Sequence, residues 1–97
     1  MERDVLSSIL EYLQWAKVFH YRQNTGAVKT EHGRFIRFGV LGSPDIICVI
    51  NGQYVGIEVK DKAKQSPHQI DFQQRLEKAG GRYILAHGVE DVVAALK

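Results

Sequence analysis

The chain has 97 residues, of which 44% are apolar and 25% are charged, a composition typical of a soluble globular protein. This length fits one domain with a modest core, and no apolar run approaches the roughly 20 residues that a membrane-spanning helix needs. The net charge of +2 does not by itself indicate a polyanionic partner. The start, MERDVLSSIL, carries acids and lacks separate basic and apolar regions, so it does not resemble a signal peptide. We therefore expect a single-domain cytoplasmic protein, in the host cytoplasm if a phage encodes it.

The first third of the chain is predicted to form a helix followed by two strands. From residue 2 to about residue 19, apolar side chains at three- and four-residue spacing predict an amphipathic helix, at Val5, Leu6, Ile9, Leu13 and Ala16. VFHYRQ (18–23) is typical of a strand, and RFIRF (34–38) alternates in the same way. Between them, the asparagine and glycines of NTGAVKTEHG (24–33) indicate a loop.

The middle of the chain is predicted to form a β-hairpin. DIICVI (45–50) and QYVGIEVK (53–60) are rich in β-branched residues, and Asn51-Gly52 between them is the strongest short sequence signal for a two-residue turn. Counting back from this turn along both strands places Asp45 opposite Glu58 on one face of the sheet. Like charges in that position destabilise a sheet, so the pair needs a compensating partner.

The last third is predicted to form a helix, a strand and a short helix. SPHQ starts the first helix, with Ser66 as its cap and Pro67 in the first helical position, and two glycines end it after about Ala79. RYILAH (82–87) is typical of a strand, and apolar spacing over 89–96 predicts a closing helix. The predicted order, α-β-β-β-β-α-β-α, indicates an α/β fold.

The opposed Asp45 and Glu58 carboxylates form a candidate cation site. Two converging carboxylates without a fixed basic partner are ligands that a hard cation such as Mg²⁺ prefers, together with water and phosphate oxygens. Lys60 shares the face of Glu58, where it would hold an attacking water or neutralise charge developing on a phosphate. In the alternative interpretation, Lys60 only balances the acids in a salt bridge. A register slip of one residue would place the two acids on opposite faces.

Gln69 and Glu2 are two further candidates for this site. Gln69 begins the helical stripe predicted to face the sheet, where its amide would touch Lys60, but it also completes a capping box begun by Ser66. Glu2 extends the apolar stripe of the first helix, but an acid in a first helical turn is also favoured by the helix dipole. Each residue therefore has a functional and a structural interpretation.

Basic residues cluster in two segments. The first has the single acid Glu31 among five cations, Lys17, Arg22, Lys29, Arg34 and Arg37. The second has only Asp61 among its cations, Lys60, Lys62 and Lys64. Clustered cations favour phosphate contacts, and the candidates for binding DNA are Lys29, Arg34, Arg37, Lys62 and Lys64. The alternative is a scatter of solvated surface charges.

Taken together, these motifs resemble a known nuclease superfamily. Pro-Asp at 44–45, Glu-Val-Lys at 58–60, the acid of the first helix and the following SPHQ are similar to the PD-(D/E)xK superfamily. Within it, the chain resembles over nearly its whole length the virus-type replication-repair nuclease domain, VRR-NUC, in its short stand-alone form, through NTGAV, GSPDII, GIEVK, SPHQ and AGGRY. Archaeal-type Holliday-junction resolvases share PD and ExK, but the GSPD and SPxQ contexts favour VRR-NUC.

The resemblance implies a restriction-endonuclease-like core, with a mixed sheet flanked by helices, that cuts DNA with Mg²⁺ or Mn²⁺. By analogy, Asp45, Glu58 and the main-chain carbonyl of Val59 bind the metal, and Lys60 positions or activates the water. Glu2 matches the acid of the family's first helix, near the metal site. Gln69 matches the family's glutamine that supports the catalytic residues.

The resemblance also implies partners. Stand-alone members resemble homodimers that act on branched DNA such as four-way (Holliday) junctions, and cutting two strands symmetrically calls for two sites related by a two-fold axis. The alternatives are a non-catalytic DNA-binding module with the same fold, and a nuclease that prefers flaps or plain duplex. A restriction-type enzyme that reads duplex sequence is disfavoured, because a chain of this length has little room for added recognition elements.

Overall fold

A computed structural model describes residues 1–23 and 26–97. Its elements are, in chain order, α1 (Glu2–Trp15), β1 (Phe19–Arg22), β2 (Gly26–Lys29), β3 (Phe35–Phe38), β4 (Ile46–Ile50), β5 (Gln53–Val59), α2 (Pro67–Lys78), β6 (Arg82–Ala86) and α3 (Val89–Ala95). No helix in the described residues has both the length and the apolar character needed to cross a bilayer.

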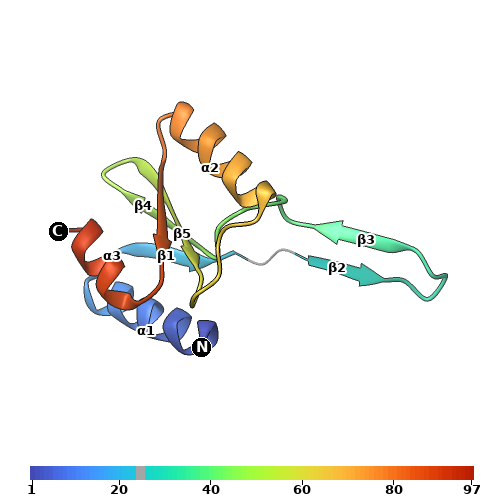
Figure 1. The fold of residues 1–97 in the computed structure, drawn as a ribbon, viewed down its shortest axis with the longest axis horizontal. Coiled ribbons are helices and arrows are strands. Elements are labelled where there is room, and N and C mark those ends of the chain that lie inside the picture. Colours follow the sequence, from blue (N-terminus) through green and yellow to red (C-terminus); the bar gives the residue numbers. More distant parts are fainter. Residues whose placement is uncertain (24–25) are drawn as a thin grey trace.

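A four-stranded sheet in the order β1-β4-β5-β6 forms the centre of the body (Figure 1). Its pairs β1–β4 and β4–β5 are antiparallel, whereas β5–β6 is parallel, so the sheet is mixed. Parallel neighbours require a crossover connection, which α2 supplies between β5 and β6. The expectation of an α/β fold with a mixed sheet and flanking helices is confirmed.

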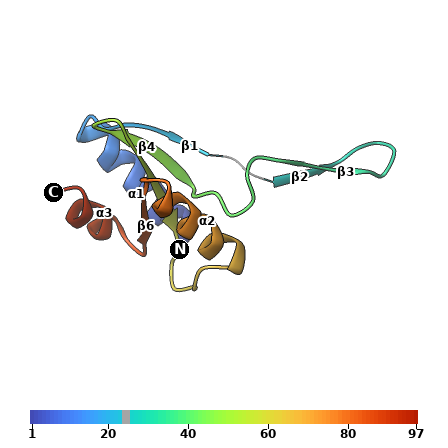
Figure 2. The ribbon, with the colours of Figure 1, turned by 90° about the horizontal axis from the view of Figure 1, so that it is seen from above.

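One predicted loop is a strand instead. Residues Gly26–Lys29 form β2 and pair antiparallel with β3, so the order has one strand more than predicted, while Asn24 and Thr25 of the same predicted loop lie outside the described residues. The pairing partner, Phe35–Phe38, is what makes GAVK a strand, since the four residues are too short to show a pattern of their own. These two strands form a separate sheet, here called the ribbon, which extends well beyond the body (Figures 1 and 2).

The β4–β5 hairpin has the predicted turn and register. Asn51 and Gly52 have φ angles of 51° and 80°, and two positive φ angles are what a type I′ turn requires. The register runs from Ile50 opposite Gln53 to Ile46 opposite Ile57, as the sequence predicts.

One face of this hairpin lies in the core. α1 and α3 cover that face and lie beside each other, apart from α2 (Figure 1). The buried cluster contains Ile9, Leu13, Ile46, Cys48, Val55, Ile57, Val59, Ile84, Ala86 and Val92. Each fully buried Ile, Leu or Val side chain contributes about 1.5–3 kcal/mol. α1 ends earlier than predicted, because Lys17 adopts a positive φ of 59° and turns the chain into β1.

The other face receives α2, which begins and ends as predicted. Ser66 and Gln69 form a capping box, Pro67 occupies the first turn, and Gly80 follows the helix with a φ of 97°. Gly42, in the loop that leads to Asp45, also has a positive φ and lies so close to α2 that a Cβ there would overlap the carbonyl oxygen of His68. The loop is thereby fitted against the start of α2.

Substitution of Gly42 tests this contact, and Gly33 is its matched control. Both have φ near +81°, but only Gly42 has neighbours where a Cβ would go. Gly33→Ala is expected to cost only the left-handed strain, about 1–2 kcal/mol. Gly42→Ala should cost a further ~1–3 kcal/mol from overpacking, measured as the free energy of unfolding in urea. Equal losses in both variants would show that the loop does not pack tightly on α2.

Candidate active site

The Asp45 and Glu58 carboxylates lie together where β4 begins and β5 ends. Asp45 directly precedes Ile46 and Glu58 directly follows Ile57, the last pair of the β4–β5 register. Asp45 Oδ2 accepts a hydrogen bond of 2.8 Å from the main-chain N–H of Val59, which holds its carboxylate against the end of β5. Burial and, after it, the negative charge of Asp45 raise the pKa of Glu58, as expected for a buried carboxyl beside another acid.

Glu58 is the buried acid of the site. The residue is only 3% exposed, and this burial, followed by the charge of Asp45, raises its pKa from 4.5 to about 8. Its Oε2 accepts a hydrogen bond of 2.9 Å from Gln69 Nε2. Its Oε1 is buried and has no hydrogen-bond partner among the described residues. A buried carboxyl oxygen without a partner costs free energy, and Oε1 is therefore an atom of this site open to a further ligand.

Gln69 caps α2, as one of its two interpretations predicts, and its side chain also reaches the site. Its amide oxygen accepts from the N–H of Ser66 at 2.8 Å, and its own N–H donates to Ser66 Oγ at 3.3 Å, which completes the capping box. Its amide nitrogen is then directed at Glu58. The predicted contact with Lys60 is not among the hydrogen bonds of the described residues, so Gln69 reaches the acid rather than the lysine.

Lys60 lies half-buried just after β5, with its main chain fixed on both sides. Its N–H donates to the carbonyl of Ala86 at 3.0 Å, and its carbonyl accepts from His87 Nδ1 at 2.7 Å. Within the described residues its ammonium forms no ion pair with Asp45 or Glu58, so the alternative of a simple salt bridge is not realised. Its positive charge nevertheless lowers the pKa of Glu58, against the effects of burial and Asp45.

A surface cavity of about 440 Å³ opens beside Asp45 and Val59. Glu2, in the first turn of α1, lines the same cavity, and its charge contributes to the raised pKa of Glu58. The sequence-based placement of Glu2 near the two acids therefore holds. In residues 1–23 and 26–97, however, no group of three or more His, Cys, Asp or Glu side chains is close enough to hold a metal ion.

Sequence reasoning missed two arginines that line this cavity, Arg3 and Arg22. The sequence assigns Arg22 only to a segment rich in cations, and it gives no signal for Arg3. Arg22 enters the site because β1 pairs with β4, which sets it opposite Ile46 and next to Asp45. The basic character of the segment was a signal, but the sequence does not say which strand β1 pairs with.

The predicted DNA-binding residues are exposed and fall into two groups. Lys29 and Arg37 lie on one face of the ribbon, and Arg34 lies just before β3. The other group lies in the loop between β5 and α2, Lys62 and Lys64. The structure thus gathers the acidic candidates and Gln69 at one place and leaves the ribbon cations apart from them.

Comparison with known proteins adds no assignment. No protein-family model matches the chain, and a search of curated proteins finds no match. What the site does is therefore inferred from its own side chains.

The raised pKa of Glu58 predicts how stability depends on pH. The folded state keeps this proton up to about pH 8, whereas the unfolded chain loses it near 4.5. In the presence of a chelator, the free energy of unfolding should therefore fall as pH rises through this window, by up to about 1.4 kcal/mol per unit. Glu58→Gln removes the titration and should flatten the profile and exceed the wild type in stability at pH 8. If urea unfolding gives the same dependence of stability on pH for the wild type and for Glu58→Gln, this prediction is wrong.

Proposed function

We propose that this chain is a divalent-metal-dependent DNA endonuclease that hydrolyses phosphodiester bonds, preferentially in branched DNA such as four-way junctions. The observation that carries the proposal is the buried Glu58, whose Oε1 has no partner in the described residues, beside the carboxylate of Asp45. The resemblance to PD-(D/E)xK nucleases of the VRR-NUC type supports the same chemistry, because its motif residues are the ones at this site.

The donors present fit a hard divalent cation. The Asp45 and Glu58 carboxylates and the main-chain carbonyl of Val59 would hold Mg²⁺ or Mn²⁺, both of which prefer oxygen ligands. A double positive charge offsets the repulsion and burial that disfavour an ionised Glu58. Substrate phosphate and water would complete the coordination, which accounts for a site where the described residues offer two acidic ligands, with Glu2 lining the adjacent cavity. Bound there, the cation supplies Lewis-acid polarisation of the phosphoryl oxygen and a more acidic water.

Lys60 is the residue best placed to act on the attacking water. Its ammonium is free of ion pairs in the described residues while its backbone is fixed at both ends. It orients the water or neutralises charge that develops on the phosphate. Attack at phosphorus breaks the bond to the 3′ oxygen and leaves a 5′ phosphate and a 3′ hydroxyl. Gln69 keeps Glu58 in place throughout.

Cations around the site would bind the rest of the DNA. Arg3 and Arg22 line the cavity next to Asp45, within reach of the phosphates that flank the scissile bond. Farther out, phosphate contacts come from the ribbon and from the loop before α2, through Lys29, Arg34, Arg37, Lys62 and Lys64. A homodimer of such units presents two sites, as cutting both strands of a symmetric junction requires.

The function is tested by incubating the purified chain with labelled four-way junction, flap and plain duplex. We expect cleavage of the junction with Mg²⁺ or Mn²⁺, slower cleavage of the other two, and none in chelator. Faster cutting of flap or duplex would correct the substrate preference. Binding of all three without cleavage, unaffected by metal, would assign the chain to non-catalytic DNA binding and overturn the proposal.

Single substitutions test the roles of the site residues. Asp45→Asn and Lys60→Ala should each lower the cleavage rate at least ~100-fold, because one removes a metal ligand and the other the cation beside the water. Binding to the junction should be retained in both, measured by fluorescence anisotropy. The matched controls are two exposed residues of α2, Asp71→Asn and Lys78→Ala, which should cleave normally. Full activity of either site variant would refute its role.

A further inference from the structure

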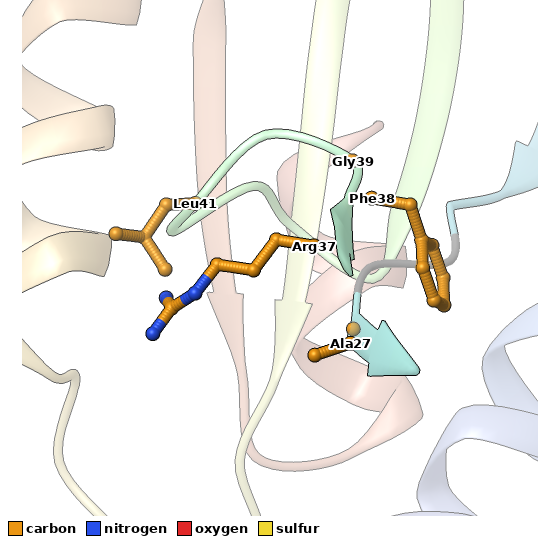
Figure 3. A pocket seen from close by; sticks show the side chains of 6 residues that line it. Ala27, Arg37, Phe38, Gly39 and Leu41 are labelled. Carbon is orange, nitrogen blue, oxygen red and sulfur yellow. The ribbon is translucent and has the colours of Figure 1, made fainter. Parts of the chain in front are cut away.

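The ribbon has two faces of different chemistry. Side chains opposite each other in the β2–β3 register share a face, so Gly26, Val28, Ile36 and Phe38 form its apolar face. Its basic face consists of Ala27, Lys29, Phe35 and Arg37. Figure 3 shows Arg37 and Phe38 leaving β3 in opposite directions, with Ala27 on the side of Arg37.

The apolar face of the ribbon is uncovered. Val28 and Ile36 are each 52% exposed and Phe38 is 44% exposed. A two-stranded ribbon alone is marginally stable in water, and contiguous exposed apolar side chains mark interaction sites. This face therefore calls for a partner.

The body carries a matching surface. On the face of the sheet opposite the core, the β1 side exposes Phe19 (66%), Tyr21 (50%) and Val49 (43%), here called the open sheet face. Phe19 pairs with Val49 across the strands, and its ring lies edge-on to that of Tyr21 with 6.4 Å between centroids. One chain thus has both an uncovered apolar arm and an uncovered apolar sheet face.

The surface area of the chain fits a missing interface. The accessible surface is 6789 Å², about 1,200 Å² more than a compact 11.0 kDa monomer is expected to have. The radius of gyration, 14.3 Å, likewise exceeds the expected value of about 12.5 Å. A stable protein dimer buries roughly 800 Å² on each partner. The excess is enough for such an interface.

We propose that the ribbon is a dimerisation arm whose apolar face packs on the open sheet face of a second copy of this chain, reciprocally. The basic face of each arm then stays outward, where Lys29 and Arg37 can contact DNA. The contact of Lys29 and Arg37 with DNA rests on the proposed nuclease function, whereas the dimer itself does not. Interfaces with DNA are polar and strongly charged, so the apolar face suits a protein partner better than phosphates.

Neighbouring residues of β3 test the proposal in matched form. The wild-type chain is expected to sediment as a dimer at concentrations on the order of 10 µM, without DNA or metal. Ile36→Glu, on the apolar face, should raise the dimer dissociation constant roughly 100-fold. Phe35→Glu introduces the same charge one residue earlier, at a side chain that is more exposed (72%) but on the basic face, and should remain dimeric.

Each contrary result overturns a part of the proposal. A monomeric wild type, or an Ile36→Glu variant that stays dimeric, excludes the arm as the dimer contact. An equal loss of dimer affinity in Phe35→Glu would mean that the two faces of the ribbon do not differ in this role. If the wild type is a monomer and the Ile36→Glu variant binds DNA more weakly than the wild type does, the apolar face contacts DNA instead. None of these readings depends on cleavage, so failure of the nuclease function and failure of the arm are separable.

A disulfide test locates the seat of the arm independently of dimer affinity. Ile36→Cys combined with Val49→Cys should give an interchain disulfide on mild oxidation, seen as a species of twice the chain mass on a non-reducing gel. Phe35→Cys combined with Val49→Cys should not. The native Cys48 is fully buried and does not compete. Absence of the interchain bond in the first pair would show that Ile36 does not lie against Val49 of the second copy.

Discussion

The geometry of the whole site depends on the Asn51-Gly52 turn. Because both residues adopt positive φ angles, the turn has two residues and no more, and this fixes the register of β4 against β5. The register brings Asp45 and Glu58 to one place and sends their neighbours Ile46 and Ile57 into the core. A slip by one residue would expose the core side chains and bury the charged ones, so burial of the apolar face and assembly of the site are enforced together.

Burying Glu58 beside Asp45 costs electrostatic free energy. Glu58 lies buried beside another acid, and among the residues that the structure describes it is held by the hydrogen bond from Gln69 and the opposing charge of Lys60. A glutamate is almost never fully buried unless it is paired. Its presence is understandable if a cation binds the buried oxygen, because a cation would offset the burial and the charge of Asp45 that disfavour an ionised Glu58.

In the ribbon, as in the β4–β5 hairpin, strand alternation gives the two faces different chemistry. Strand alternation gives one face to apolar side chains and the other to cations, so a single short hairpin can contact a protein and a nucleic acid at once. In the proposed dimer the arm would cover the sheet face that α2 leaves open, while the cavity with Arg3, Arg22 and Asp45 lies on the α1 side of β1 and β4. The arm would then lie on the β1 side of the sheet face that also carries Glu58, whereas the cavity opens on the α1 side.

The sequence by itself determined the features that neighbouring residues decide: the Asn51-Gly52 hairpin with its register, the capped start and glycine end of α2, and hence the approach of Asp45 to Glu58. Local signals suffice there, because a turn or a cap satisfies its own backbone groups. Only the tertiary structure decided that GAVK is a strand, that Arg22 reaches the site, and that Gln69 contacts Glu58 while capping α2. Each of these depends on which distant segment lies alongside, and pairing between distant segments is set by packing of the whole chain, not by local preference.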